Sequence, residues 1–192
     1  MKAFIASLVL FMTMPTMAAA ADDGGWYMGI GAGQSALRDV CSLVGPTATC
    51  DDEPVGWKVF AGRDMSKYFG LELSYTDAGE AKIVDSSATP GTLNIRPKLV
   101  TASAKLELPL GSRFSLLGKV GLTYFSVDYE RTGVFQALSS GDDGLEPSLG
   151  AGFAFKLSKR VAIRAEWEHF NDAVGLASGD IDMATASLLY HF

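Results

Sequence analysis

The segment Asp180–Phe192 reads Asp-Ile-Asp-Met-Ala-Thr-Ala-Ser-Leu-Leu-Tyr-His-Phe, and every second residue from Ala184 to Phe192 is apolar. This period of two indicates a β-strand, because successive side chains of a strand point to opposite faces. An apolar face that ends on an aromatic residue is typical of a strand in a transmembrane β-barrel, whose rings lie at the bilayer interface. The segment therefore predicts a lipid-facing strand, with the last strand of a soluble β domain as the alternative.

The first residues of the chain predict export. Lys2 precedes an apolar run from Phe4 to Met17, and four alanines follow at Ala18–Ala21. A positive residue, a short apolar core and small residues at a cleavage position are the features of a secretory signal peptide. We therefore predict a signal peptide over residues 1–21, because its apolar core is too short for a membrane-spanning helix.

The composition excludes one class of partner and predicts one covalent bond. Hydrophobic residues make up 48% of the chain, and they are spread in short runs among 21 glycines. The net charge is −6, whereas a nucleic-acid-binding surface needs a stripe of Lys and Arg. Cys41 and Cys50 are the only cysteines. Because export exposes them to an oxidising compartment, we predict that they form a disulfide bond.

The same alternation recurs along the rest of the chain. It predicts further strands at Gly25–Gly33, Val55–Arg63, Tyr68–Thr76, Asn94–Leu108, Phe114–Tyr129, Ser148–Leu157 and Val161–Phe170. The connections at 35–54, 77–93 and 130–146 are long, the one at 171–179 is intermediate, and the others are short. Outer-membrane barrels alternate short periplasmic turns and long extracellular loops in this way. The sequence therefore predicts an all-β fold over residues 22–192, an eight-stranded antiparallel up-and-down transmembrane β-barrel.

The positions of three glycines and one proline lead to two further predictions about these strands. The glycines at 29, 31 and 33 lie inside the first strand, and not between a strand and a helix as a nucleotide-binding loop requires. We interpret them as inward positions that leave room for long side chains. Pro97 lies near the outer end of its strand, where strand pairing is expected to stop.

Several short segments resemble the OmpA-like family of transmembrane barrels. They are Gly25–Gly29, Tyr68–Tyr75, Leu117–Gly121, Arg164–Trp167 and Asp180–Asp182, and they occur in this order along the chain. The resemblance implies a barrel in the outer membrane of a Gram-negative bacterium, among outer-membrane lipid and lipopolysaccharide. Full-length members carry a peptidoglycan-binding domain after the barrel, whereas this sequence stops at Phe192, so peptidoglycan anchoring is not expected.

The last strand also predicts a partner in assembly. Its apolar positions Leu188, Tyr190 and Phe192 finish the chain on an aromatic residue. We expect the barrel-assembly machinery to recognise these three side chains.

Charged residues occupy many inward positions of the predicted strands. The residues that we predict to form a charge network are Glu72, Lys105, Glu107, Lys119, Arg164 and Glu166. Lys58, Lys156 and Glu168 are further charged residues at inward positions. Isolated buried charges are costly, so we predict a network of ion pairs across the lumen. In the family that the chain resembles, the acid placed as Glu72 pairs with an Arg placed as Arg164 or a Lys placed as Lys105, and this exchange is proposed to gate a small pore. The family's second inner acid is replaced here by Ala154, and static packing and a gated pore both remain as hypotheses.

Catalysis is not expected. The segment Glu168–Ala173 resembles the pattern of outer-membrane lipid deacylases, in which a nucleophilic Ser follows a His by two positions, but Asn171 occupies that position after His169. Without a hydroxyl group the His has nothing to activate. Neither His169 nor His191 has partners at metal-ligand spacing, and we predict no metal and no cofactor.

The long connections are acidic, for example at Asp51–Glu53 and at Asp143, which predicts a solvated outer rim. From all these features we predict a non-enzymatic outer-membrane barrel with a structural or surface-exposed role in the cell envelope. The alternatives are a narrow or gated ion-conducting pore, and an adhesin or host-factor receptor that binds through its extracellular loops.

Overall fold

The computed structural model describes residues 25–38, 41, 48–85, 90–133, 142–173 and 179–192. The predicted signal peptide at residues 1–21 lies outside these described residues. Within them, no helix is long and apolar enough to cross a membrane.

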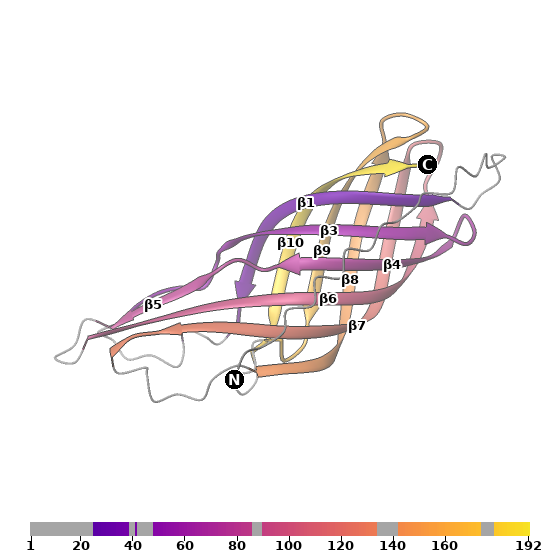
Figure 1. Ribbon diagram of the computed structural model, residues 1–192. Coiled ribbons are helices and arrows are strands. Elements are labelled where there is room, and N and C mark those ends of the chain that lie inside the picture. The colour runs from indigo at the N-terminus through magenta and orange to yellow at the C-terminus, as the bar shows by residue number, and fades with distance from the viewer. Residues whose placement is uncertain (1–24, 39–40, 42–47, 86–89, 134–141, 174–178) are drawn as a thin grey trace.

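Eight strands close into an antiparallel barrel (Figure 1). They are β1 (Trp26–Leu37), β3 (Val55–Asp64), β4 (Phe69–Asp77), β6 (Gly91–Pro109), β7 (Phe114–Arg131), β8 (Asp142–Lys156), β9 (Val161–Phe170) and β10 (Ile181–His191). Each pairs with the next in this order, and β10 returns to β1 from Tyr27↔His191 to Leu37↔Ile181. The predicted fold class is confirmed, and each predicted strand corresponds to one strand of the barrel.

The two ends of the barrel differ in the length of their connections. Four residues join β3 to β4, β6 to β7 and β8 to β9. These turns lie at the same end as the C-terminus, where the amide of Phe192 donates to the carbonyl of Trp26 at 3.0 Å. Because short turns mark the periplasmic end of an outer-membrane barrel, the longer connections lie on the extracellular side.

Two short strands lie in segments that were predicted as loops. β2 (Ala48–Asp51) pairs with β5 (Ala81–Asp85), and β5 pairs with the first part of β6. β6 and β7 also begin or end beyond the predicted limits, and together these four strands form an extracellular extension that projects from the barrel (Figure 1). The prediction of long loops at 35–54, 77–93 and 130–146 was therefore wrong in part, because β1, β7 and β8 also extend into these ranges.

The extension escaped the sequence prediction because β6 reverses its polarity along its length. In the membrane part, the outward residues are apolar, as at Val100 and Leu106. In the extension the outward residues are polar, as at Arg96 and Lys98, and the inward residue Ile95 is fully buried. A sheet with water on its outer side needs its apolar residues inside, so the pattern changes phase where the lipid ends.

Pro97 does not end the pairing of β6, contrary to the sequence prediction. It pairs with Val127 of β7, and its carbonyl accepts a hydrogen bond from the amide of Ala78 at 3.1 Å. Residues 78–80 form the break between β4 and β5. In an antiparallel ladder the N–H and C=O of one residue point to the same side, so the missing N–H of Pro97 faces this break and removes no regular ladder bond.

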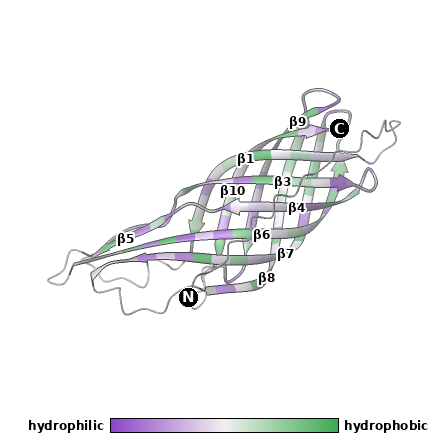
Figure 2. Cartoon of the chain, in the orientation of Figure 1, coloured by the Kyte–Doolittle hydropathy of each residue, from purple (hydrophilic) through white to green (hydrophobic). Residues whose placement is uncertain are grey.

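The outer wall of the barrel is an apolar belt between two rows of aromatic residues. Hydrophobic and hydrophilic residues alternate along the barrel strands (Figure 2), and large outward side chains such as Ile30 and Leu73 are 60% and 58% exposed. The aromatic residues are Trp57, Tyr75, Tyr124 and Trp167 near the extracellular end and Trp26, Tyr68, Tyr190 and Phe192 near the periplasmic end. Such a belt with aromatic girdles is the surface that lipid requires.

Apolar residues also fill the two ends of the interior. Tyr27, Phe60, Ala162 and Leu189 form a periplasmic layer. The extracellular core comprises Leu37, Ala78, Ala81, Ile83, Leu93, Ile95, Leu99, Phe125, Val127, Phe170, Ala173, Ile181 and Met183. These two groups enclose the charged centre of the lumen.

Candidate functional site

Glycines on the inner wall make room for the charged side chains at the centre. A Cβ atom built on Gly150 of β8 would lie 3.2 Å from Cγ of Glu168 and 3.4 Å from Cε of Lys119. One built on Gly152 would lie 2.9 Å from Cα of Glu166. The bare inner face of β8 therefore allows the long side chains of the neighbouring strands to lie across a narrow lumen.

Glu72 of β4 is bound from three sides. Nη1 of Arg164 on β9 lies 2.8 Å from its Oε2, and Nζ of Lys119 on β7 lies 3.1 Å from its Oε1. The hydroxyl of Tyr27 on β1 donates to Oε2 at 2.9 Å. Four strands that are distant in sequence thus meet at one buried carboxylate.

Glu166 and Glu168 of β9 complete the network. Glu166 lies 2.9 Å from Nε of Arg164, 2.7 Å from Nζ of Lys119 and 3.1 Å from Nζ of Lys58. Glu168 lies 2.6 Å from Nζ of Lys119 and also contacts Lys58. Three cations and three carboxylates therefore balance within the network. We call Lys58, Glu72, Lys119, Arg164, Glu166 and Glu168 the lumen network, and each of these residues is at most 5% exposed.

Lys105 and Glu107, which were predicted in the same network, form a separate group nearer the periplasm. Nζ of Lys105 lies 2.8 Å from Asp64 and 3.0 Å from Glu107. Because Lys105 pairs with Gly70 and Glu72 pairs with Ser103, Lys105 lies closer to the periplasmic turns than Glu72 does. Lys119, and not Lys105, is the lysine that contacts Glu72 in this structure.

The sequence interpretation missed two residues of these groups. Tyr27 shares the inward face of its strand with the glycines at 29, 31 and 33, and Asp64 directly follows the predicted strand Val55–Arg63, so neither was included in the predicted network. Tyr27 lies between the groups: its hydroxyl binds Glu72, and Nζ of Lys105 lies 4.5 Å from the centre of its ring. The only sequence signal for this role was a single large polar side chain on an otherwise small inward face.

The segment that resembles a deacylase forms a polar cluster at the extracellular end of the barrel. Nδ1 of His169 lies 2.9 Å from Oδ1 of Asp182, and Nε2 lies 3.0 Å from Oδ1 of Asn171. The amide group of Asn171 donates to the carbonyl of Pro147 at 3.1 Å. An acid, an imidazole and a third polar group are therefore aligned, but the third group is a carboxamide where a hydrolase would need a nucleophile.

Asp182 also binds Arg38, which follows β1, at 2.6 Å. Burial alone raises the pKa of Asp182, but the hydrogen bonds from His169 and Arg38 outweigh it and hold the pKa below its usual value. This carboxylate therefore joins the ends of β1, β9 and β10 at the outer rim while it is ionised.

Two other predicted features have the following positions. Cys41 and Cys50 form a disulfide bond with Cα atoms 5.7 Å apart, which confirms that prediction and joins residue 41 to β2. Leu188, Tyr190 and Phe192 all face outward, and the rings of Tyr190 and Phe192 lie edge to face at 5.3 Å. Among the described residues, no three His, Cys, Asp or Glu side chains converge as metal ligands.

A closed sheet with an apolar outer belt and a charged interior defines a membrane-spanning β-barrel. The profile of the family described as "Outer membrane protein beta-barrel domain" matches residues 4–192 of the chain. The protein belongs to this family, and its location is the bacterial outer membrane.

Two curated relatives of the chain are outer-membrane proteins. It is 29% identical to outer membrane protein A of Serratia marcescens over 100% of this chain and 56% of that protein. Identity to outer membrane protein A of Yersinia pseudotuberculosis is 25%, over 89% of this chain and 48% of that protein. The chain therefore spans about half the length of these curated relatives.

The fold is similar to that of Ail, the attachment invasion locus protein of Yersinia pestis, with a TM-score of 0.60 at 17% identity over 89% of this chain and all of that one. It is also similar to OprG of Pseudomonas aeruginosa, with a TM-score of 0.58 at 14% identity over 88% of this chain and 93% of that one. These likenesses concern the fold.

Proposed function

We propose that the protein is a non-conducting, non-enzymatic barrel that supports the outer membrane and presents a rigid extension outside the cell, after removal of residues 1–21. The observation that carries this proposal is the lumen network, which is buried and balanced in charge, with an apolar layer on either side. Eight strands leave an interior just wide enough for side chains. A lumen filled in this way favours a role in stabilising the barrel over a role in conducting ions.

The contacts of Glu72 also argue against a gate. A gate that works by partner exchange needs a carboxylate that pairs with one cation at a time. Glu72 contacts Arg164 and Lys119 together, through different oxygens. Both cations also contact Glu166, so a movement of one side chain would break several ion pairs at once.

Conductance across a planar bilayer tests the proposal directly. The refolded chain should be silent, and so should Glu107→Gln, a matched carboxylate change outside the lumen network. Discrete current steps from the unmodified chain would support the alternative, a narrow pore, especially if Glu72→Ala or Arg164→Ala changed their size. A band that migrates faster before boiling than after it would show that each silent sample is folded.

A second candidate function is surface recognition. The extracellular extension shares one continuous apolar core with the end of the barrel, and the disulfide bond ties residue 41 to β2, which favours a rigid shape. Ail, whose fold is similar, is named the attachment invasion locus protein and has been solved in complex with the heparin analogue sucrose octasulfate. Replacing residues 81–95 by a short turn should abolish adhesion of cells that display this protein if the extension is an adhesin. Unchanged adhesion would contradict the adhesin role and leave the structural role as the only proposed function.

We further propose that the barrel-assembly machinery recognises Leu188, Tyr190 and Phe192. Their outward position on the last strand supports this, because a partner can reach them before the barrel closes. Phe192→Ala should lower the amount of assembled barrel in cells but leave refolding into detergent unchanged. Equal losses in both assays would assign the ring to stability alone.

A further inference from the structure

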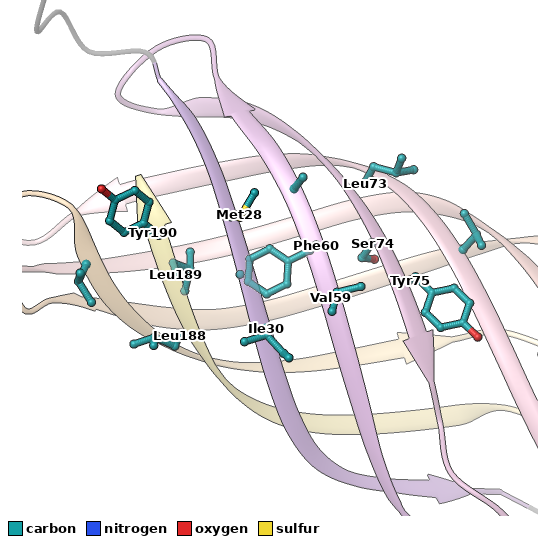
Figure 3. Close-up of a pocket in the computed structure, with 14 residues that line it drawn as sticks. Met28, Ile30, Val59, Phe60, Leu73, Ser74, Tyr75, Leu188, Leu189 and Tyr190 are labelled. Atoms are coloured by element: carbon teal, nitrogen blue, oxygen red, sulfur yellow. The ribbon is translucent and has the colours of Figure 1, made fainter. Parts of the chain in front are cut away.

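The apolar belt contains a groove on one side of the barrel. It has a volume of about 660 Å³ and lies over β10, β1, β3 and β4, reaching Val100 of β6 (Figure 3). This volume falls within the range of about 300–1,000 Å³ that is usual for small-molecule sites. Tyr190 and Tyr75 lie at opposite sides of the groove in this view.

The groove arises because a small outward side chain lies between two large ones. Ala61 of β3 pairs with Met28 of β1 and with Leu73 of β4. The two neighbours rise on either side of the alanine methyl group, and all three line the groove. Since the wall lies within the membrane belt, hydrocarbon is the medium that fills it.

The extracellular end of the groove leads to two cations. Tyr75 and Val100 pair with each other across β4 and β6, and the next pair of the same register towards the extracellular side is Asp77, which is buried, and Lys98, which is partly exposed. Arg96 follows on β6, and its Nη2 lies 2.8 Å from Oδ2 of Asp77. A ligand chain in the groove would therefore have its polar end beside Arg96 and Lys98.

The two cations keep donors for a further acceptor. Lys98 lies 2.6 Å from Asp128, and the side chains of Lys98 and Arg96 are 39% and 50% exposed. A guanidinium has five N–H donors and an ammonium has three, more than Asp77 and Asp128 use. The hydrogen bonds that Arg96 and Lys98 donate to these carboxylates raise the pKa of both cations, so they remain charged. The carboxylates also hold both side chains in place on the outer surface.

We propose that this groove binds a phosphorylated, acylated lipid of the outer leaflet, with an acyl chain against Ala61 and a phosphate on Arg96 and Lys98. The inference deepens the expected association with outer-membrane lipid, and it does not depend on whether the lumen conducts. Arg pairs with phosphate through paired N–H groups, which a neutral headgroup cannot match.

Native mass spectrometry of the refolded protein tests the site with lipid A as the probe. Dephosphorylated lipid A and inorganic phosphate serve as the two partial probes. The unmodified chain should retain one lipid A and at least tenfold less of the dephosphorylated form, and should retain no phosphate alone. Equal retention of both lipids would overturn the role of the cations, and retention of free phosphate would overturn the role of the acyl chain.

Substitutions in the two halves of the site separate their roles. The double variant Arg96→Gln and Lys98→Gln should lose at least tenfold in lipid A retention, whereas Lys159→Gln, in a periplasmic turn, should not. Ala61→Phe fills the groove and should cause a similar loss, whereas Ala151→Phe, on the outward face of β8, should not. If Ala61→Phe does not fold, Ala61→Leu makes the same test with less added volume. Equal losses in a variant and its control would overturn the site.

Every variant is first checked for the folded, fast-migrating band on a gel without boiling. The conductance of the unmodified chain is measured on the same preparation. If the unmodified chain conducts no current and also retains no lipid A, only this inference is overturned. If it retains lipid A but conducts current, only the proposed function is overturned.

Discussion

Glu72 and Arg164 are 92 residues apart in sequence, yet Nη1 of Arg164 lies 2.8 Å from Oε2 of Glu72 inside the barrel. The pair joins β4 to β9, which lie on different sides of the closed sheet. Neither side chain is exposed by more than 1%, so water does not take the place of a lost partner. The consequence is that the two halves of the sheet depend on each other through charge as well as through backbone pairing.

Removing this carboxylate should therefore destabilise the barrel strongly. Glu72→Gln leaves Arg164 and Lys119 with one fewer negative partner in a buried space. Breaking a buried ion pair costs about 3–5 kcal/mol, and we expect the free energy of unfolding to fall by that amount. Urea unfolding in lipid vesicles, followed by tryptophan fluorescence, measures it. Glu107→Gln is the control, because Glu107 is 19% exposed and should cost about 1 kcal/mol or less. Equal losses would contradict the central position of Glu72.

The inner face of β8 should not tolerate larger residues. Gly152→Val would force Cβ against the backbone of β9, only 2.9 Å from Cα of Glu166. Overpacking of this kind typically costs about 1–3 kcal/mol, which the same unfolding measurement should detect. Gly118→Val is the matched control, because the nearest atom to a Cβ at Gly118 is the carbonyl oxygen of Gly150 at 3.9 Å. A stable Gly152→Val barrel would mean that the lumen is looser than these contacts indicate.

The outer rim should weaken in acid. The hydrogen bonds from His169 and Arg38 hold the pKa of Asp182 below its usual value, despite the opposing effect of burial. A carboxyl group with a lowered folded pKa stabilises the protein above its unfolded pKa of about 3.9, and this stabilisation is lost as the pH falls through the folded pKa. Asp182→Asn should therefore destabilise the barrel by about 1 kcal/mol at pH 6 and by much less at pH 3. Unfolding at both pH values checks this, and an equal effect at both would contradict it.

The disulfide bond should affect the extension and spare the barrel. Closing the short loop between Cys41 and Cys50 restricts the unfolded chain by at most about 3 kcal/mol. In the double variant Cys41→Ser and Cys50→Ser, we expect faster amide hydrogen exchange in β2 and β5 and no change in β9. Exchange that increased equally in all three strands would show that the bond stabilises the whole fold.

The membrane part of the fold could be predicted from sequence because lipid imposes one rule on every strand: the outward residues must be apolar, and they alternate with inward ones. β9 was predicted at Val161–Phe170 and has those bounds, since Ile163 and Trp167 alternate with Arg164 and Glu166. The short strands β2 and β5 were not predicted. They have four and five residues and pack in an extracellular sheet, where the lipid rule does not apply.

The candidate site was harder to predict than the strands. Alternation identifies which charges point inward, but it does not say which of them meet. Lys105 and Lys119 pair directly across β6 and β7, and only the direction of each side chain brings Lys119 to Glu72 and Lys105 to Asp64. Those directions depend on the stagger of the whole closed sheet, which no single strand encodes.

The change of polarity along β6 also fixes how deep the barrel sits. Its outward face is apolar at Val100 and charged at Lys98, two residues nearer the extracellular side. A shift of the barrel towards the periplasm would draw Lys98 and Arg96 into hydrocarbon, and a shift the other way would bring Leu106 and Leu108 into water. The protein therefore has one preferred height in the bilayer. Anything carried on the extracellular extension is held at a constant distance above the cell surface.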